Sequence, residues 1–351
     1  MWPMSVEVER DSLPQRERVV LLYNVDSSLT PQEAAECMQE VDEMESALRR
    51  EFSAVERAEV QTDVAAALQE IDPREAVIFN WCEGIDGRPA AYDLVAGVLD
   101  ELGYAYTGSD AWTLRHTQNK SAFKTILDAW GVATPDWRVC ASPRDASDWT
   151  TFPAIVKPVA EHSSVGLTVD SVVDDSAGLV RQIERVMDTW GEGALLEEYI
   201  AGRELYASIW GNGAPEVLPL HEVDFNEIED PKRRFVDYEA KWQTESFRYR
   251  HMPERYPSTL DGAPADRVRA AAIAAYRALR CRDYARMDLR MRDSDGMPFV
   301  IDVNPNCDIT LEAGFTKTAQ VAGYDYSAML ARIVAWASQR LPARVKQEGA
   351  R

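Results

Sequence analysis

Two short segments near the C-terminus, 284–290 and 299–304, have the alternating apolar and polar pattern of half-buried β-strands. Between them, residues 293–296 read Asp-Ser-Asp-Gly, a sequence typical of a turn. The two strands are therefore expected to pair as an antiparallel hairpin. A hairpin here places an α+β arrangement in the C-terminal part of the chain.

The polar side chains of this hairpin are expected on one of its faces, because side chains alternate along a strand. Arg286 and Asp288 share a face of the first strand, and Asp302 and Asn304 share a face of the second. Pairing brings Asp288 roughly opposite Asp302, whereas Ile301 belongs to the opposite, apolar face. Close carboxylates repel unless a cation lies between them, and oxygen ligands suit Mg²⁺. The pattern predicts a magnesium site, and a solvated outer sheet face remains an alternative.

Composition excludes several classes of function. The formal charge of −21 over 351 residues, without a Lys/Arg run, argues against nucleic acid as a partner. No apolar stretch approaches the length of a membrane span, and residues 1–18 lack the apolar core of a signal peptide. The five cysteines are scattered and the four histidines form no paired motif. These features predict a cytoplasmic protein with reduced thiols and no membrane association.

The first third of the chain alternates between strand and helix patterns. Thr30-Pro31 is typical of a capped helix start, with proline at the first helical position. The expected elements are strands at 18–23 and 76–80 and helices at 30–50, 62–70 and 90–102. This order predicts a parallel sheet in an N-terminal α/β domain, residues 17–115, after a disordered segment, residues 1–16. No Gly-x-Gly-x-x-Gly follows the first strand, so a dinucleotide-binding fold has no fingerprint.

The remainder divides into two further units, a central subdomain at 116–200 and a C-terminal subdomain at 201–342, followed by a tail at 343–351. Besides the hairpin, the patterns predict helices at 119–130, 176–189, 265–279 and 327–341 and strands at 137–140, 152–158, 167–172, 194–199 and 202–210. Residues 224–257, hereafter the lid, are long, charged and aromatic, with no clear periodicity. Such segments are functional lids or mobile surface insertions, and both interpretations stay open.

The central subdomain contains residues suited to a nucleotide. Lys157 ends an apolar strand and offers a positive charge to phosphate oxygens. Ser163, Ser164 and Gly166 lie in a short loop whose hydroxyl and N–H donors can enclose phosphates. Glu197 and Glu204 flank a strand end, where carboxylates can accept hydrogen bonds from an adenine amine and from ribose. Taken separately, the serine loop is equally consistent with a plain turn and the two glutamates with exposed charges. The interpretation as a nucleotide site therefore depends on the order in which these features occur along the chain.

Taken together, these stretches resemble the ATP-grasp superfamily and, within it, carboxylate–amine ligases similar to D-alanine–D-alanine ligases. The resemblance covers about residues 105–340. The matching motifs are Asn119-Lys120, Ile155-Val156-Lys157-Pro158, Ser163-Ser164-Val165-Gly166, Leu196-Glu197-Glu198-Tyr199-Ile200 with Glu204, Tyr238-Glu239-Ala240-Lys241, Ala285-Arg286-Met287-Asp288 and Asp302-Val303-Asn304-Pro305. The fold implied is an ATP-grasp fold behind an N-terminal parallel-sheet α/β domain.

The resemblance implies a role for each matched residue. ATP phosphates are expected at Lys120, Lys157 and the loop Ser163, Ser164, Val165 and Gly166. Adenine is expected at Glu197, Glu198, Tyr199 and Ile200, and ribose at Glu204. Lys241 is expected to reach the terminal phosphate from the lid, and Ser164 is counted with Lys241 and Arg286 among the catalytic residues. Asp288, Asp302 and Asn304 are expected to bind two Mg²⁺ ions, for which Mn²⁺ is an expected substitute.

The implied reaction proceeds in two steps, and positioning and electrostatics carry most of the catalysis of such reactions. ATP phosphorylates a substrate carboxylate to give an acyl phosphate and ADP, and an amine then attacks to give an amide and phosphate. Arg286 is expected to stabilise the oxyanion. An ATP-grasp phosphotransferase without an amine step and a non-catalytic nucleotide-binding protein are the alternatives. The partners are small-molecule carboxylate and amine substrates, and family resemblance alone implies a homodimer.

Several segments depart from the D-alanine–D-alanine ligase pattern. Residues 22–28 lack the glycines and the glutamate that grip the first amino acid, and a histidine common in the family is replaced within residues 80–84. Residues 305–310 differ from the pattern used for the second alanine, Asp302 replaces the usual glutamate, and His162 stands where a glycine is typical. The ATP chemistry is therefore expected to be kept and the amino-acid pockets changed. A ligase of specialised metabolism fits better than an authentic D-alanine–D-alanine ligase.

Overall fold

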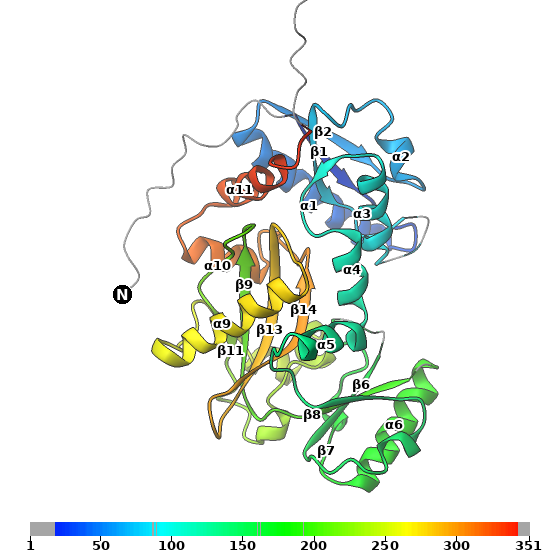
Figure 1. The fold of residues 1–351 in the computed structure, drawn as a ribbon, viewed down its shortest axis with the longest axis vertical. Helices are drawn as coiled ribbons and strands as arrows, with labels where there is room; N and C mark the ends of the chain where they lie inside the picture. The colour runs from blue at the N-terminus through cyan, green and yellow to red at the C-terminus, as the bar shows by residue number, and fades with distance from the viewer. Residues whose placement is uncertain are drawn as a thin grey trace, which may run out of the picture.

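The computed structural model describes residues 18–342 except 86, 87, 89, 160, 162 and 192, and these residues form three sheets (Figure 1). The mixed α/β class expected from the sequence is confirmed. The expected disordered segment 1–16 and tail 343–351, together with His162, lie outside the described residues. Among the described residues, none of the helices combines the length and apolar character needed to cross a bilayer.

The first sheet is parallel, as predicted, with the strand order β2 (Ala54–Glu59), β1 (Arg18–Tyr23), β3 (Ala76–Trp81) and β4 (Ala105–Tyr106). Its principal helix, α1 (Pro31–Glu51), begins with a reciprocal capping box. The Thr30 hydroxyl accepts from the N–H of Glu33, and the Glu33 carboxylate accepts from the N–H of Thr30. These two bonds fix the helix start at the predicted residue.

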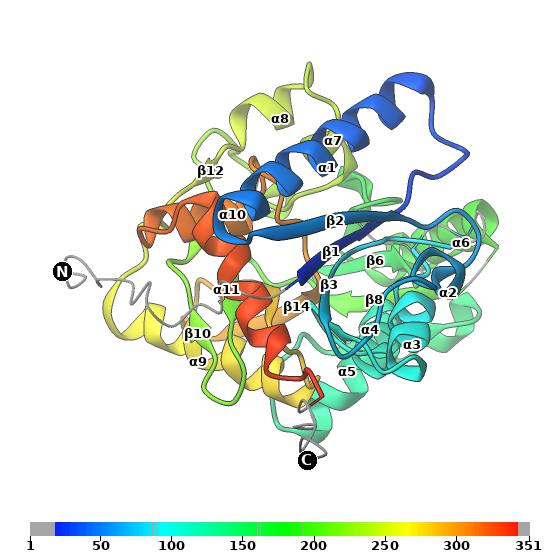
Figure 2. The same ribbon diagram turned by 90° about the horizontal axis from the view of Figure 1, so that it is seen from above.

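Both faces of this sheet are covered by helices (Figure 2). Val19 and Leu21 point to a core shared with α1 and the last helix, α11 (Tyr326–Ser338). Val20 and Leu22 point to the other core, which α2 (Val64–Ala67) and α3 (Tyr92–Glu101) complete. The continuous apolar run of β1 follows from this burial on both faces. The chain thus returns to its first sheet at the end of its described part.

The second sheet is antiparallel, with the order β5 (Trp137–Cys140), β8 (Ala194–Glu198), β6 (Ala154–Pro158) and β7 (Val172–Val173). Helix α6 (Ser176–Trp190) packs on one face through Leu179, Ile183 and Val186. A short 3₁₀ helix, η2 (Pro143–Ala146), follows β5. The other face lies toward the nucleotide-binding candidates.

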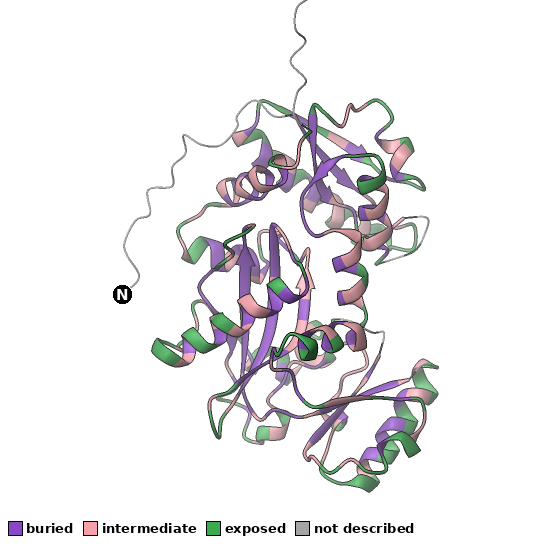
Figure 3. Ribbon diagram, viewed as in Figure 1, coloured by how far each residue is buried: buried purple, intermediate pink, exposed green. Residues whose placement is uncertain are grey.

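The third sheet has the order β12 (Glu254–Arg255), β11 (His221–Val223), β9 (Gly202–Trp210), β13 (Tyr284–Arg292) and β14 (Pro298–Pro305), with β10 (Glu216–Val217) pairing with β9. Helices α9 (Gly262–Ala278) and α5 (Lys120–Ala129) cover one face with apolar side chains. The central strands of this sheet are almost entirely buried (Figure 3). The uncovered polar positions of β13 and β14 face a cavity shared with the second sheet.

The structure corrects several expectations. The helix expected at 62–70 spans only Val64–Ala67. The strand expected at 167–172 is mostly a loop and a 3₁₀ helix, η3 (Val169–Ser171), because the Ser171 hydroxyl accepts from the N–H of Thr168 and competes with strand pairing. The elements that were not predicted include β2, β4, α4 (Ala111–Gln118) and α10 (Gly314–Val321), and also the short strands β10, β11 and β12 and the helices within the lid.

The lid is folded and contains η4 (Pro231–Arg233), α7 (Tyr238–Trp242) and α8 (Phe247–His251) before it reaches β12. A buried ion pair holds it, with Arg248 Nε 2.9 Å from Asp237 Oδ1. Arg248 also donates to the carbonyls of Arg233 and Phe235. A buried, fully paired charge requires an ordered backbone, so this arrangement favours the interpretation as a lid over that as a mobile surface insertion.

Candidate active site

Strands β13 and β14 place two carboxylates directly opposite each other. Asp288 pairs with Asp302, in agreement with the predicted approximate register, and Arg286 pairs with Asn304. A β-bulge follows, because Leu289 pairs with Val300 and leaves Ile301 as the extra residue. Ile301 therefore lines the cavity, and its expected place on the opposite face was wrong.

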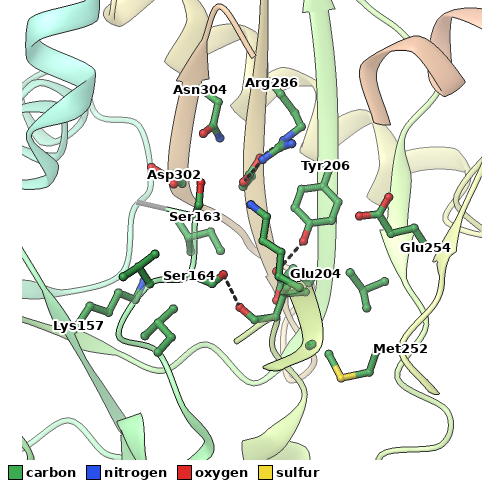
Figure 4. A pocket seen from close by; sticks show the side chains of 18 of the residues that line it. Lys157, Ser163, Ser164, Glu204, Tyr206, Met252, Glu254, Arg286, Asp302 and Asn304 are labelled. Carbon is green, nitrogen blue, oxygen red and sulfur yellow. Dashed lines mark hydrogen bonds and ion pairs between the residues drawn. The ribbon is translucent and has the colours of Figure 1, made fainter. Parts of the chain in front are cut away.

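These residues open onto a cavity of about 530 Å³ between the second and third sheets (Figure 4). Most of the residues with expected roles line it, in particular the three lysines, the serine loop and the polar face of the hairpin. These residues are Lys120, Lys157, Ser163, Ser164, Val165, Glu204, Lys241, Arg286, Asp288, Asp302 and Asn304.

A smaller pocket adjoins this cavity, and Lys157, Glu204 and Ile301 line both spaces. Its wall holds the expected adenine residues Glu197, Glu198, Tyr199 and Ile200 together with Phe235. The one remaining predicted residue, Gly166, lines neither space. Gly166 has a φ of +78°, and a Cβ there would lie 2.6 Å from Pro158 Cγ, so it shapes the turn of the loop.

Arg286 and Asp288 form a two-point ion pair. Arg286 Nε lies 2.7 Å from Asp288 Oδ1, and Arg286 Nη2 lies 2.9 Å from Asp288 Oδ2. Burial raises the pKa of Asp288, the Arg286 charge lowers it, and Asp302 raises it again. The Asp288 carboxylate is therefore costly to bury without a cation beside it.

The donor set of this hairpin suits Mg²⁺ bound together with a nucleotide. It consists of Asp288, Asp302 and the amide of Asn304, whose Nδ2 is buried without a hydrogen-bond partner. No group of three or more His, Cys, Asp or Glu residues in the described part of the chain could hold a metal ion alone. Mg²⁺ typically takes one or two carboxylates plus substrate phosphates, so this smaller set fits it.

A buried three-residue charge cluster lies at the junction of the two pockets. Glu197 is 1% exposed and forms ion pairs with Lys124 and Lys157. Burial raises the pKa of Glu197, but the two lysines outweigh it and bring the pKa to about 2. The Lys124 ammonium also donates to the Thr134 hydroxyl at 2.7 Å. Lys157 is therefore held at the cavity wall by Glu197.

Lys124 was not identified by sequence reasoning, although it follows Lys120 by four residues and therefore lies on the same face of α5. Lys120 lines the cavity and donates to the carbonyl of Glu161. Burial lowers the pKa of both lysines. The spacing was the available signal, since two lysines on the apolar face of a buried helix require partners.

Glu204 is held rigidly between the two pockets. Its Oε1 accepts from the Tyr206 hydroxyl at 2.9 Å, and its Oε2 accepts from Arg290 Nη1 at 2.8 Å. Arg290 also donates to the carbonyls of Ile200 and Gly202. Arg290 therefore fixes both the carboxylate and the linker beside it, a role that sequence reasoning missed.

The lid closes over the serine loop through three hydrogen bonds. The Ser164 hydroxyl donates to the carbonyl of Val236 at 2.9 Å, and Trp242 Nε1 donates to the carbonyl of Ser163 at 3.0 Å. The N–H of Tyr238 donates to the carbonyl of Leu167. Ser163 and Ser164 have φ values of +54° and +61°, a strained conformation that these contacts stabilise.

Lys241 lies on α7, the lid helix that also carries Trp242, and it lines the cavity. Burial and the Arg286 charge lower the pKa of Lys241, while Asp288, Asp302 and Glu254 raise it. The Lys241 ammonium is thus held among the groups expected to bind metal and phosphate.

The three segments that depart from the ligase pattern meet between the first and third sheets. Asn24 Oδ1 accepts from the N–H groups of Glu83 and Gly84, at 2.8 and 3.3 Å. Burial raises the pKa of Glu83, with a further increase from Asp308. Glu40 of α1 belongs to the same group, and burial together with Asp308 and Glu83 raises its pKa to about 7.

Comparison with known proteins agrees with this architecture. The family described as D-ala D-ala ligase C-terminus matches residues 127–335. An uncharacterised protein, y4sG, of Sinorhizobium fredii is 33% identical over 264 residues, which are 75% of each chain. The D-alanine–D-alanine ligase of Bacillus anthracis is 32% identical over 255 residues, covering 71% of this chain and 77% of the ligase.

Solved structures show the same fold. The crystal structure of D-alanine–D-alanine ligase from Bacillus anthracis has a TM-score of 0.69 at 26% identity, covering 92% of this chain and 98% of that one. The same enzyme complexed with ATP gives 0.68 at 25% identity, with the same coverage. The fold and the cavity define an ATP-grasp ligase that forms carbon–nitrogen bonds. The chain belongs to the D-alanine–D-alanine ligase family.

Proposed function

We propose that this protein joins a small carboxylate to an amino acid or another amine, with ATP as the energy source and an acyl phosphate as the intermediate. The observation that carries the proposal is one cavity lined by three lysines, by Arg286 and by the opposed pair Asp288 and Asp302. Such a wall suits a triphosphate next to a second reacting group.

In the first step, the residues of this chain position ATP. The smaller pocket, lined by Ile155, Tyr199 and Phe235, suits adenine, and the rigid Glu204 suits ribose. Lys120, Lys157 and Lys241 suit the phosphates. Asp288, Asp302 and Asn304 would hold magnesium, which supplies positive charge to offset that of the phosphates.

In the second step, Arg286 stabilises charge on the reacting carbonyl. The amine forms a C–N bond to the acyl carbon, the carbonyl oxygen becomes an oxyanion, and the C–O bond to phosphate then breaks. Arg286 lies beside Asp288 at the cavity wall, which supports a role for its guanidinium next to the transferred phosphoryl group. The closed lid keeps water from the acyl phosphate, which water would hydrolyse.

The substrates are proposed to differ from two D-alanines. The first listed relatives with named activities are D-alanine–D-alanine ligases, but the segments around Asn24, Glu83 and Asp308 carry an acidic group at the sheet junction. Changed pockets with a retained nucleotide site fit a ligase of specialised metabolism. An authentic D-alanine–D-alanine ligase and an ATP-grasp phosphotransferase remain the alternative functions.

The test is a screen of small carboxylates and amino acids with ATP, magnesium and hydroxylamine. Hydroxylamine traps an acyl phosphate as a hydroxamate, whatever the natural amine. We expect hydroxamate and ADP in equal amounts for one class of carboxylate, and an amide when amines replace hydroxylamine. A stable phosphorylated product that hydroxylamine does not capture would favour the phosphotransferase, and activity with D-alanine alone would favour the authentic ligase.

We further propose a homodimer, on family resemblance alone. Light scattering on the purified protein would measure its mass against the 39.5 kDa of one chain. A mass of one chain at working concentration would contradict the dimer without affecting the proposed reaction.

A further inference from the structure

Glu254 occupies a wall of the large cavity for which the reaction so far gives no role. It lies on the edge strand β12 and lines the cavity opposite Lys157 and Ser164 (Figure 4). Arg286 and Tyr206 lie between Glu254 and Asp302 in this view. The Glu254 side chain remains accessible to solvent through the cavity although protein atoms surround it. A carboxylate is therefore available beyond Arg286, on the side away from Lys157.

Among the described residues Glu254, like Asp302, has no ion-pair partner, in contrast to Asp288 and Glu204. Asp288 is paired with Arg286, and Glu204 is paired with Arg290. Within the described residues, Glu254 forms no ion pair, and its hydrogen-bond partner is the hydroxyl of Tyr256. The nearby Lys317 instead lies 3.1 Å from Glu312. An unpaired carboxylate in a cavity wall favours a cationic group of a bound molecule.

The orientation of Glu254 is fixed by a stack of three rings. His221 is buried and stacks between Tyr206 and Tyr256, with ring centroids 4.8 and 4.7 Å apart. The hydroxyl of Tyr206 donates to Glu204, and the hydroxyl of Tyr256 donates to Glu254. The stack therefore holds one carboxylate at each end, so the spacing between the nucleotide side and the Glu254 wall is rigid.

Gly314 makes this stack possible. A Cβ at Gly314 would lie 3.0 Å from His221 Nε2 and 3.2 Å from the Tyr256 hydroxyl oxygen. The first residue of α10 thus packs tightly against the two rings, and a larger side chain there would have to displace them. The position of Tyr256, and through it that of Glu254, is set by packing.

We propose that Glu254 binds the ammonium group of the amine substrate and accepts one of its protons as the amine attacks the acyl phosphate. This inference rests on the proposed ligase function. An amine reaches the site mainly as an ammonium ion, which has no lone pair for attack. Transfer of one proton to Glu254 frees the lone pair, the C–N bond forms, the C–O bond to phosphate breaks, and a second proton leaves the nitrogen with the phosphate or to water.

The surroundings of Glu254 are consistent with this role. Burial raises the pKa of Glu254, and Arg286 and Lys317 lower it, with smaller influences from Asp288, which raises it, and Lys241, which lowers it. The groups facing Glu254 therefore include charges of both signs. A carboxylate in such surroundings can carry a proton between the two steps of the attack.

The test compares two nucleophiles in the same variant. Glu254→Gln keeps the size of the side chain and the hydrogen bond from Tyr256, but cannot accept a proton. With the carboxylate found by the hydroxylamine screen, we expect amide formation near neutral pH to fall by about 10²-fold. Hydroxamate formation should stay at the wild-type rate, because hydroxylamine is already unprotonated there. Raising the pH above the pKa of the amine should restore much of the amide formation.

Two further variants separate this role from a structural one. Glu312→Gln, the same change at an exposed site outside the cavity, should leave both reactions unchanged. Tyr256→Phe removes the hydroxyl that orients Glu254 and should shift the pH profile of amide formation but not of hydroxamate formation. Equal loss of amide and hydroxamate in Glu254→Gln, or wild-type amide formation, would overturn the assignment. If wild-type protein yields no hydroxamate with any carboxylate, the proposed function fails, and this inference fails with it.

Discussion

Arg286 and Asp288 bind each other through two contacts of 2.7 and 2.9 Å, although the reaction gives them different partners. The Asp288 carboxylate is proposed to bind the metal, and the Arg286 guanidinium is proposed to stabilise the oxyanion. Arg286→Lys keeps the charge but loses the planar two-point geometry. We expect kcat for ADP formation to fall by 10²–10³, about 2.7–4 kcal/mol, with little change in ATP affinity measured by calorimetry. The control Arg267→Lys, on α9, should have no effect.

A second prediction concerns the charges that face each other at the hairpin and the phosphate wall. Asp288→Asn removes one carboxylate of the pair, and Lys157→Ala removes a cation from the wall of the same cavity. Each should abolish ADP formation, while circular dichroism remains that of the wild type. Turnover comparable to the wild type in either variant would remove these residues from the site.

A third prediction concerns Lys124, which has no contact with either pocket but pairs with Glu197. Lys124→Met leaves the buried Glu197 with Lys157 alone. We expect a loss of stability toward the lower end of roughly 3–5 kcal/mol, measured by urea unfolding near neutral pH. ATP affinity should also fall, because Lys157 then pairs more strongly with Glu197 and is less available to the phosphates. Unchanged stability would contradict the cluster as a structural element.

The hydrogen bond from Trp242 to the Ser163 carbonyl gives a fourth prediction. Trp242→Phe removes the donor and keeps an aromatic ring. Such a bond is worth about 1 kcal/mol, so lid closure should weaken by about fivefold. More acyl phosphate should then be lost to water, and the ratio of ADP to amide should rise above one. Phe247→Leu, at an exposed position of α8, is the control and should leave the ratio at one.

The raised pKa of Glu40 gives a fifth prediction, about pH and stability. Burial and the neighbouring carboxylates raise the pKa to about 7, above the ordinary value of 4.5, so the folded state binds more protons than the unfolded state between these values. Stability therefore falls as the pH rises through this window. Glu40→Gln should stabilise the protein above neutral pH, by less than about 1 kcal/mol because the side chain is half exposed, and should have little effect below pH 4.5.

The outcome for Glu40 is read from urea unfolding curves of both proteins across this pH range. The matched change Glu51→Gln, at the other end of the same helix, should give no pH-dependent difference. An equal difference between wild type and Glu40→Gln at all pH values would contradict a link to protonation.

The sequence predicted the elements whose signals are local. The capping box at Thr30 fixed the start of α1, and the alternating pattern of the hairpin predicted the pairing of Asp288 with Asp302. Strand β2 was missed because Glu56, Arg57 and Glu59 give it the composition of a surface loop, a common feature of edge strands. The bulge that turns Ile301 into the cavity depends on pairing register, which no local pattern carries.

The residues of the candidate site also fall into those that the sequence predicted and those that it did not. Motifs of several residues in a fixed order indicated the lysines, the serine loop and the hairpin. Glu254, Arg290 and Lys124 stand outside such motifs, and their partners are 2, 86 and 73 positions away. Although Tyr256 is only two residues from Glu254, this spacing did not indicate a role for Glu254. The role depends on the rings that fix Tyr256 and on the cavity that Glu254 faces.

The packing of α11 against the first sheet affects how the chain folds during its synthesis. Met329, Ile333 and Val334 share a core with Val19, Leu21 and Phe79, which are separated from them by about 250 residues or more. During synthesis this face of the N-terminal sheet is therefore covered by α1 alone, and the apolar surface that α11 covers stays exposed until the ribosome has delivered almost the whole polypeptide. A nascent chain stalled before Tyr326 should bind holdase chaperones through this exposed apolar surface, even though every strand of the first sheet has already emerged.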